Sequence, residues 1–317
     1  MVRHATLAGL LTVPLILPSC LCFSSSSPLC TSLPGGDLSS APAVSSRPST
    51  AACGATMAAT PAGKLLVLGG TGFVGSEIVK QAVDKGFDVV AVSRRGGDSE
   101  AAKKALAGVK VDWRVGDVTK EEVVKEVLSE GGFTGMVHAV GILFETDMNK
   151  FASGSGSIPA PGTTYDLITR QTAQAAAGAL AATKAPGGDP LPFAFVSAAE
   201  ARWTFDGAFK GTPVEWLHRY LIAKRAVESD LVDNHGKAGA LRPIIVRPSL
   251  VWTWSKPASF LPVGAFTVGN ALGLPFVDRP VQVSTLAKSI VGAILDPKES
   301  GIFDFRGMER VAKAVGK

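Results

Sequence analysis

The sequence predicts a doubly wound α/β fold, in which helices cover both faces of a parallel β-sheet. From Lys64 onward, short and nearly continuous apolar runs alternate with segments whose apolar residues recur at helical spacing. Strands that are buried on both faces read as such runs, and helices connect them when they are parallel. The chain has 317 residues, of which 46% are hydrophobic, so it can bury a sizeable core.

Each element follows from the position of an apolar run or a helical period. In the first helix, Val74, Ile78 and Ala82 share one face, and Gly86 is a plausible C-terminal stop. The predicted strands are 64–70, 87–93, 109–117, 135–141, 193–199 and 243–252. The predicted helices between them include 73–86, 99–108, 119–131 and 165–184.

Two segments lack a regular period. Residues 144–164 follow the fourth predicted strand, and loops of this length are usually functional or disordered. Residues 252–276 are apolar and aromatic but irregular. We interpret them as a part of the chain that packs onto the sheet, with a wall for an apolar substrate or a membrane-surface contact as the alternatives.

The first 60 residues differ in composition from the rest. Two basic residues precede the apolar segment 5–19, as in a signal peptide, but this segment is short and interrupted by prolines, unlike a membrane span. The Ser-, Ala- and Pro-rich stretch that follows cannot bury enough apolar surface to fold. Such a leader resembles those that route proteins into the plastids of algae, and a mitochondrion is the alternative destination.

The composition of the remaining chain excludes several classes of function. The formal net charge is +5 and basic residues are scattered, which argues against a nucleic-acid partner. All four cysteines lie in the first 53 residues, and the later histidines lack the spacing of metal ligands. We therefore expect no metal site, and no transmembrane helix after the leader.

A glycine-rich turn joins the first predicted strand to the first predicted helix. Glycines in this context allow a tight turn and close approach of the backbone to a pyrophosphate, which meets the N–H groups of the helix N-terminus. A glycine turn without a ligand is the alternative. The residues expected to contact a dinucleotide here are Gly69, Gly70, Thr71, Gly72, Phe73, Val74 and Gly75.

The end of the second predicted strand indicates which dinucleotide is bound. An acidic residue there would accept a hydrogen bond from a ribose 2′-hydroxyl, but this chain has Ser93, Arg94 and Arg95. Two guanidinium groups suit a 2′-phosphate, so the sequence favours NADP over NAD. Asp117, followed by Val118, ends the third strand, where it can accept from the adenine amino group or cap the next helix.

Tyr220 and Lys224 are four residues apart in a predicted helical segment, so they lie on one face. A nearby ammonium group favours the tyrosinate form, which suits acid–base chemistry. Taken alone, the pair is as expected of an ordinary helix with one packed and one solvated side chain. Other motifs of the chain have to decide between these interpretations.

The order of these motifs resembles the short-chain dehydrogenase/reductase superfamily, in its extended and atypical branch. The motifs are the glycine turn, "GDVT", "HAVG", a serine after the fifth strand, "YLIAK" and "VRPS". More narrowly, the chain resembles a group that contains the NADPH-binding accessory subunit of respiratory complex I, a Rossmann protein of the coenzyme-Q synthesis complex and related plastid proteins. The resemblance implies an NAD(P)-binding Rossmann fold over residues 61–250, between the leader at 1–60 and a small C-terminal region at 251–317.

The resemblance also implies roles for individual residues. Tyr220 would be the general acid or base, Lys224 would lower the pKa of Tyr220 and hold the nicotinamide ribose, and Ser197 would hydrogen-bond the substrate oxygen. The residues expected to border the cofactor beyond the glycine turn are His138, Ala139, Val140, Gly141 and Pro248. For His138, packing or backbone capping is the alternative.

Two functions are compatible with this sequence. The first is an NADP(H)-dependent oxidoreductase that acts on a carbonyl or alcohol, such as an apolar quinone or isoprenoid compound. The second is a non-catalytic NAD(P)H-binding protein that assists a membrane-associated complex, because a cofactor site does not ensure turnover. The 22 residues between Ser197 and Tyr220 are more than classical members of the superfamily have, and Tyr165 is expected to be structural.

Overall fold

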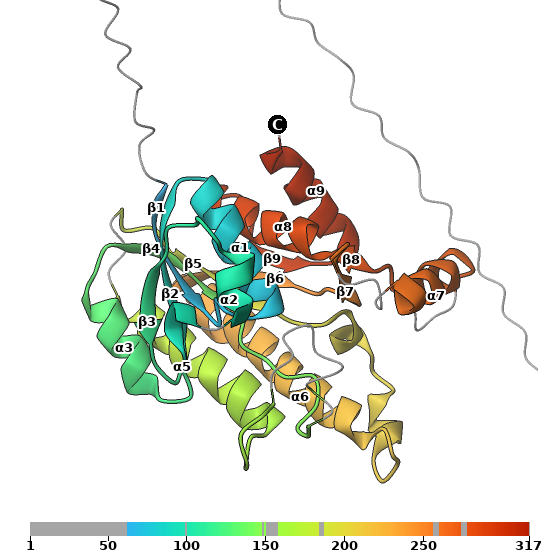
Figure 1. The fold of residues 1–317 in the computed structure, drawn as a ribbon. Coiled ribbons are helices and arrows are strands. Elements are labelled where there is room, and N and C mark those ends of the chain that lie inside the picture. The colour runs from blue at the N-terminus through green and yellow to red at the C-terminus, as the bar shows by residue number, and fades with distance from the viewer. Residues whose placement is uncertain are drawn as a thin grey trace, which may run out of the picture. The chain divides into compact units, whose positions relative to one another are not determined.

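The computed structural model describes residues 62–98, 100–147, 149, 158–183, 187–255, 260–273 and 278–316 (Figure 1). The chain divides into two units, Met1–Thr56 and Met57–Lys317, and every described residue belongs to the second unit. The predicted targeting leader lies outside the described residues.

Seven parallel strands form the main sheet, in the order β3-β2-β1-β4-β5-β6-β9. The strands are β1 (Gly63–Leu68), β2 (Phe87–Ser93), β3 (Asp112–Val115), β4 (Phe133–His138), β5 (Leu191–Val196), β6 (Leu241–Val246) and β9 (Gly301–Phe303). The chain runs outward in one direction from β1 to β3 and in the other from β4 to β9. This order is the doubly wound topology, so the predicted fold class is confirmed, and ligands of such sheets bind where the strand order reverses.

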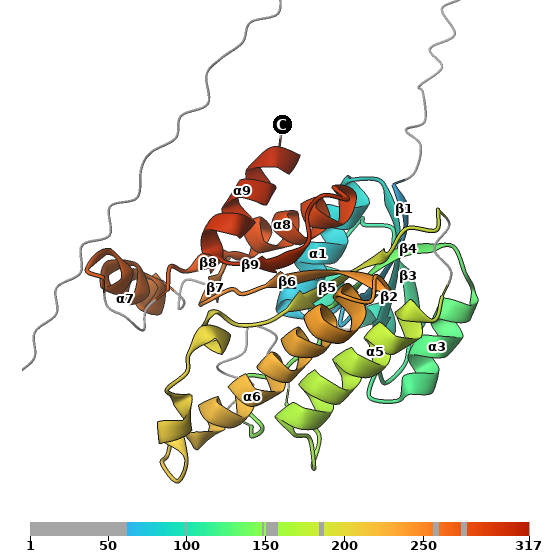
Figure 2. The same cartoon turned by 180° about the vertical axis from the view of Figure 1, so that it is seen from behind.

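Helices cover both faces of the sheet (Figures 1 and 2). One face carries α1 (Phe73–Asp84), α8 (Val283–Leu295) and α9 (Phe305–Val315), and the other carries α3 (Glu121–Ser129), α5 (Thr172–Ala181) and α6 (Glu215–Ser229). Strand β1 shows how one sequence serves both layers. Leu65 and Val67 pack into the core under α1 and α8, whereas Leu66 and Leu68 pack into the core under α3 and α5.

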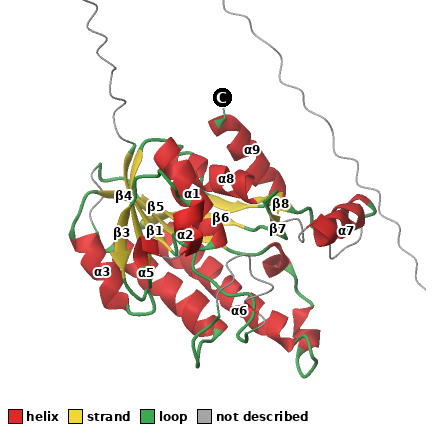
Figure 3. Cartoon of the chain, in the orientation of Figure 1, coloured by secondary structure: helices red, strands yellow, loops and turns green. Residues whose placement is uncertain are grey.

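The segment from Trp252 onward is more regular than its sequence suggests. It contains α7 (Phe260–Ala271) between the strands of a small two-stranded sheet, β7 (Val251–Trp252) and β8 (Val281–Gln282) (Figure 3). Helix α7 combines glycines with apolar residues on all sides, so its sequence has no amphipathic period. Two of its neighbouring side chains are exposed, Val268 on the helix and Leu272 just after it.

Short elements complete the fold. Helix α2 (Glu100–Ala105) follows β2, and single 3₁₀ turns lie at Gly96–Asp98, Ala199–Arg202 and Asp206–Phe209. π-helical turns occur at Asp166–Gln171 and Asp230–Gly236. In the parts of the chain that the structure describes, no helix is long and apolar enough to cross a membrane.

Candidate active site

The glycine turn between β1 and α1 has the geometry that a pyrophosphate requires. Gly69 has a φ of 84°, a left-handed conformation that glycine adopts readily. A Cβ atom on Gly75 would lie 2.1 Å from the Gly69 carbonyl oxygen, so only glycine lets α1 pack this closely on the turn. On Gly72, by contrast, a Cβ atom would meet only the Gly69 oxygen at 3.3 Å, so the side of Gly72 that would carry a side chain is open.

The start of α1 is available to an anion. Its N-cap is Gly72, and no side chain accepts a hydrogen bond from the first-turn N–H groups. These N–H groups and the positive end of the helix dipole attract phosphate oxygens. The turn therefore fits the pyrophosphate of a dinucleotide.

A cavity of about 310 Å³ opens beside this turn, at the carboxyl ends of β1, β2 and β4. The predicted cofactor residues that line it are Gly69, Thr71, Gly72, Ser93, Arg94, Asp117, Val118, Ala139, Val140 and Gly141. We call this the dinucleotide cavity. Its position is the point where the strand order reverses, as the topology predicts.

Other predicted cofactor residues do not line the dinucleotide cavity. These residues are Gly70, Phe73, Val74, Gly75, Arg95, His138 and Pro248. Gly70 is packed, since a Cβ atom there would lie 2.9 Å from that of Ala91, and Gly75 supports the turn from behind. Their contacts with a cofactor remain predictions.

One wall of the dinucleotide cavity consists of residues outside the sequence motifs. Residues 158–163, together with Leu167 and Ile168, close the side of the dinucleotide cavity opposite the glycine turn. The only sequence signal for this wall is the length of the segment 144–164, in which a ligand contact is plausible but no residue stands out.

The residues expected to bind the adenosine part of the dinucleotide lie at the ends of β2 and β3. The Ser93 hydroxyl donates to the Gly96 carbonyl at 3.0 Å, which shapes the loop that carries Arg94 and Arg95. Both arginines are exposed and form no ion pair with any described residue. The Asp117 carboxylate accepts from the Thr119 N–H at 3.0 Å, so it stabilises its own turn while it lines the dinucleotide cavity.

Lys224 ties α6 to the sheet. Its ammonium group donates to the Val196 carbonyl at 2.7 Å and lies 5.6 Å from the centre of the Tyr220 ring. A Cβ atom on Gly141 would be 3.8 Å from the same nitrogen. The structure thus brings α6, the end of β5 and the loop after β4 together around Lys224. Burial lowers the pKa of Lys224 to about 8, against the opposing charge of Glu228.

Ser197 is held next to this group by the backbone. Its N–H donates to the Val246 carbonyl at 2.8 Å, and the following Ala199 N–H donates to the Pro248 carbonyl at 2.9 Å. The Ser197 hydroxyl is buried and has no hydrogen-bond partner among the described residues. A buried hydroxyl without a partner is costly, and a substrate oxygen would satisfy it.

Tyr220 differs from the expectation in one respect. Its hydroxyl forms no hydrogen bond with a described residue, and its ring packs edge-on against Tyr165, with ring centres 5.6 Å apart. Burial raises the pKa of Tyr220, and the charges of Glu200 and Tyr165 raise it further. The sequence suggested that Lys224 would lower this pKa, and that expectation is wrong for the site as the structure describes it.

Tyr165 supports the site rather than taking part in it. Its hydroxyl donates to the Leu143 carbonyl at 2.9 Å, and its N–H donates to Glu145 at 2.8 Å. Glu145 in turn accepts from Arg219 of α6 at 2.9 Å. These contacts attach the loop after β4 to α6 and agree with the structural role expected for Tyr165.

His138 is buried at the end of β4 as a neutral ring. Its Nε2 atom lies 2.9 Å from the Thr172 hydroxyl, which itself donates to the Ile168 carbonyl, so Nε2 must carry the proton and Nδ1 has no partner among the described residues. Burial and the charge of Lys224 lower the pKa of His138 to about 3. These surroundings agree with the alternative that His138 is a packed residue of the core.

The insert between Ser197 and Tyr220 contains charges that sequence reasoning did not single out. Asp206 is buried, and it accepts from the ring of His218 at 2.6 Å and from both terminal nitrogens of Arg225. Arg225 also donates to the Trp203 carbonyl at 3.1 Å. Asp206 thus fastens the insert to α6. His218 and Arg225 are seven residues apart, two helical turns, and this spacing was the only sequence signal.

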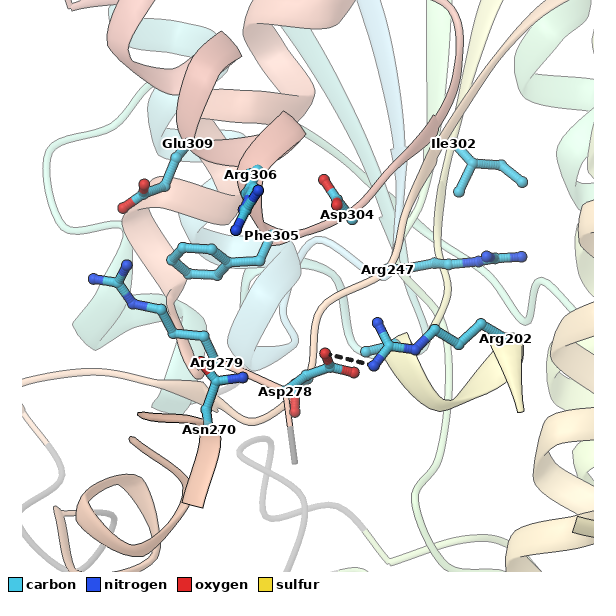
Figure 4. A pocket seen from close by; sticks show the side chains of 12 residues that line it. Arg202, Arg247, Asn270, Asp278, Arg279, Ile302, Asp304, Phe305, Arg306 and Glu309 are labelled. Carbon is cyan, nitrogen blue, oxygen red and sulfur yellow. Dashed lines mark hydrogen bonds and ion pairs between the residues drawn. The ribbon is translucent and has the colours of Figure 1, made fainter. Parts of the chain in front are cut away.

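A second cavity, of about 640 Å³, lies at the carboxyl ends of β6 and β9 (Figure 4). We call it the arginine cavity, because four arginines line it: Arg202, Arg247, Arg279 and Arg306. They come from segments that are far apart in the sequence, and only Arg247 belongs to a motif, "VRPS", so the sequence does not indicate this cavity. Among the described residues, no group of three or more His, Cys, Asp or Glu side chains is placed to hold a metal ion.

Comparisons with known proteins concern the family and the fold. Residues 65–151, which contain the glycine turn and strands β1 to β4, match the NAD dependent epimerase/dehydratase family. MIOREX complex component 2 of Saccharomyces cerevisiae is 27% identical over 286 residues, which cover 79% of this chain and 99% of that protein. An uncharacterized chloroplastic protein of Arabidopsis thaliana, At1g32220, is 24% identical over 273 residues, 80% of this chain and 78% of that protein.

Solved structures with the same fold are more distant in sequence. UDP-glucose 4-epimerase of Thermus thermophilus in complex with NAD superposes with a TM-score of 0.51 at 19% identity, over 80% of this chain and 84% of that one. Together with the family match and the two relatives, this similarity fits an atypical branch of the short-chain dehydrogenase/reductase superfamily. The resemblance drawn from the motifs is therefore confirmed.

Proposed function

We propose that this chain, which fits an atypical branch of the short-chain dehydrogenase/reductase superfamily, is an NADP(H)-dependent oxidoreductase that acts on a carbonyl or alcohol. The observation that carries the proposal is the convergence of three side chains. Lys224 is fixed on the Val196 carbonyl beside the Tyr220 ring, and the adjacent Ser197 offers a buried hydroxyl without a partner. A purely structural helix would not need a buried lysine and an unsatisfied serine next to a dinucleotide cavity.

The three side chains have distinct roles in this proposal. The nicotinamide supplies or accepts the hydride when it is bound. The Ser197 hydroxyl donates to the substrate oxygen and so fixes its position. The Tyr220 hydroxyl donates the proton that this oxygen needs as a carbonyl becomes an alcohol. The raised pKa of Tyr220 keeps the hydroxyl protonated at neutral pH, so the site is arranged for reduction.

Lys224 has two consequences for the reaction. With its pKa lowered to about 8, it is mostly cationic at neutral pH and becomes neutral in mildly alkaline solution. Its position between Gly141 and Tyr220 suits contact with the ribose hydroxyls of the cofactor.

The preference for NADP rests on Arg94 and Arg95. Arg94 lines the dinucleotide cavity at the end of β2, and neither guanidinium is paired with a carboxylate among the described residues. An acidic residue that would repel a 2′-phosphate is absent from this strand end, where Ser93 stands instead.

A second candidate function is a non-catalytic NAD(P)H-binding protein of a larger complex. Two observations favour it: the Tyr220 hydroxyl has no hydrogen bond with a described residue, and one relative is a component of a complex by its name. The destination of the chain stays a proposal as well. The chloroplastic relative supports a plastid, and the predicted leader agrees with it, whereas the yeast relative keeps the mitochondrial alternative.

The test is a Tyr220→Phe variant, assayed for NADPH oxidation against a panel of aldehydes, ketones and quinones. Loss of a general acid costs about 10²–10⁴-fold in turnover. We expect a loss of this size, with the dissociation constant of NADPH within about twofold of the wild type, because the hydroxyl touches the substrate and not the pyrophosphate. Tyr165→Phe is the matched control and should keep most of the activity.

Two outcomes would contradict the enzyme. One is full activity of Tyr220→Phe with a substrate that the wild type reduces. The other is tight NADPH binding by the wild type without oxidation by any member of the panel, which would favour the non-catalytic function.

A further inference from the structure

The arginine cavity is separate from the dinucleotide cavity and no residue lines both. It lies where β6 and β9 end, between the 3₁₀ turn Ala199–Arg202, the start of α9 and the last turn of α7. Its volume of about 640 Å³ is in the range of small-molecule sites. The residue types that line it are mainly charged.

Two of its four arginines are neutralised within the protein. Arg202 donates to Asp278 at 2.8 Å, which Figure 4 shows as the ion pair at the cavity, and Arg247 donates to Glu228 of α6 at 2.9 Å. Both guanidinium groups therefore have a carboxylate partner and contribute little net positive charge to the cavity.

Arg279 and Arg306 have no carboxylate partner among the described residues. Arg279 lies 4.7 Å from the centre of the Phe305 ring, a cation–π contact that orients the guanidinium but leaves its charge. The acidic residues nearby are already used: Asp304 accepts from the Gly307 N–H at 2.8 Å as the N-cap of α9, and Glu309 pairs with Lys313. Arg279 and Arg306 are thus the two guanidinium groups of the cavity without a carboxylate partner among the described residues, and Asp304 adds one negative charge beside them.

One acceptor in the cavity is also unsatisfied. The Oδ2 atom of Asp278 is buried without a hydrogen-bond partner among the described residues, whereas Oδ1 of the same carboxylate accepts from Arg202. Buried polar atoms in native proteins are nearly always paired, so this atom indicates a ligand or water at this place. A carboxylate oxygen accepts only, which means that the ligand brings a hydroxyl or N–H group as well as a negative charge.

Glu200 connects this cavity with the catalytic side chains. It belongs to the 3₁₀ turn whose Ala199 and Arg202 line the cavity. Its charge acts on Tyr220 on one side and interacts with that of Asp278 on the other. The same turn packs against α6, the helix that carries Tyr220, so it joins the arginine cavity to that helix.

We propose that the arginine cavity binds the phosphate group of a phosphorylated, hydroxyl-bearing organic molecule. A dianionic phosphate accepts from the unpaired guanidiniums of Arg279 and Arg306 at once, through three oxygens. A carboxylate has only two acceptor oxygens. The volume beyond the phosphate, next to Phe305, is left for the organic part. Calling this molecule the substrate rests on the proposed function, whereas its binding does not.

This inference differs from the sequence-based expectation of an apolar quinone or isoprenoid substrate. The side chains of the arginine cavity are charged on most sides, and transfer of an apolar molecule into contact with them would leave those charges without water or a counter-ion. A phosphorylated substrate supplies that counter-ion.

The experiment is a calorimetric titration of the full chain with phenyl phosphate, in the presence of saturating NADPH so that the dinucleotide cavity cannot bind the probe. We expect one site in the wild type. Arg279→Gln and Arg306→Gln should each weaken it by about tenfold, the size of one charge-assisted hydrogen bond. Lys288→Gln removes the same charge from an exposed position of α8 outside the cavity, and it should stay within about twofold of the wild type.

Further probes identify the ligand chemistry. Inorganic phosphate should bind more weakly than phenyl phosphate, since it leaves the space next to Phe305 empty, and benzoate should bind more weakly than both because it carries one charge. If inorganic phosphate binds more tightly than phenyl phosphate, the ligand of the cavity is the free ion and not an organic phosphate. If benzoate binds most tightly, the ligand is a carboxylate. Both results overturn the proposal.

The variants also separate binding from folding and from catalysis. Arg279→Lys and Arg306→Lys keep the charge, so they should retain part of the affinity even if a glutamine variant is unstable in a melting experiment. Equal affinity of the wild type and both glutamine variants would exclude this cavity. Binding of the probe to a chain that does not oxidise NADPH would reject the oxidoreductase and leave the phosphate site intact.

Discussion

The two cavities stand at the same edge of one sheet, yet they are built from different parts of the chain. In the dinucleotide cavity the key contacts are backbone: glycines that admit a ligand closely, and a helix N-terminus without a side-chain cap. In the arginine cavity they are long charged side chains from the 3₁₀ turn Ala199–Arg202, the residue after β6, the loop before β8 and the start of α9. A backbone site accepts any ligand that carries the same phosphates, whereas a side-chain site can change its ligand by single substitutions.

This difference determines how a substitution in each cavity changes ligand binding. The glycine turn of the dinucleotide cavity cannot tolerate added atoms, so substitutions in this turn act through shape. The arginine cavity can tolerate a shorter side chain, so its substitutions act through charge. The predictions below, together with those for Tyr220 and for Arg279 and Arg306, test this contrast in order of the effect expected.

The largest effect is expected at Gly75. A Cβ atom there would lie 2.1 Å from the Gly69 oxygen, so Gly75→Ala must move the turn or α1. We expect about 100-fold weaker NADPH binding and a loss of about 1–3 kcal/mol in the free energy of unfolding. Gly178→Ala on α5 is the control, because a Cβ atom there meets nothing within 4 Å; it should bind normally and gain about 0.5–1 kcal/mol.

Gly72→Ala should change the shape of the dinucleotide cavity without a large change in the stability of the fold. Its Cβ atom would meet only the Gly69 oxygen at 3.3 Å, so the fold should lose little free energy, but the methyl group would enter the dinucleotide cavity. Loss of NADPH binding with an unchanged melting temperature is expected. Unchanged binding in Gly72→Ala would place the pyrophosphate elsewhere.

Acid should lower the free energy of unfolding through His138, which is buried at the end of β4. This histidine has a pKa of about 3 in the folded chain against about 6.5 when unfolded, so between these values only the unfolded chain takes up the proton. The stability that the neutral ring contributes is present above pH 6.5 and is lost as the pH falls, by about 1.4 kcal/mol per unit. From pH 6.5 to 4.5 the free energy of unfolding should fall by about 2 kcal/mol more in the wild type than in His138→Leu. Parallel pH profiles of the two proteins would show that the ring is protonated in the fold. The arginine cavity has no histidine in its lining and should not share this dependence.

The smallest effect concerns the choice of cofactor. Arg94→Ala combined with Arg95→Ala should weaken NADPH about 10–100-fold in calorimetry, as expected for lost charge-assisted hydrogen bonds, and leave NADH within about twofold. Lys80→Gln, an exposed charge on α1, is the control and should affect neither. Equal losses for both cofactors would remove the basis for the NADP preference.

Sequence reasoning reached the fold and the dinucleotide cavity because their signals are local. The glycine turn, Arg94 and Asp117 each follow a strand, and parallel strands bring their carboxyl ends together. Ser197, Tyr220 and Lys224 could be found for the same reason: two lie on one helix face and the third ends a neighbouring strand.

The features that were missed depend on contacts between distant segments. Arg202, Arg279 and Arg306 are ordinary surface residues in the sequence, and only the fold places them around one cavity. The pKa of Tyr220 depends on burial and on Glu200, neither of which a spacing of four residues contains. Strand β9 has three residues, which is too short for an apolar run, and its place beside β6 completes the sheet.

The central claim is that the glycine turn holds an NADP(H) molecule, and a direct measurement is a fluorescence titration of the wild-type chain with NADPH and with NADH. We predict one equivalent of NADPH per chain, bound at least about tenfold more tightly than NADH, as the two arginines at the end of β2 imply. The absence of saturable binding of either dinucleotide would contradict the claim.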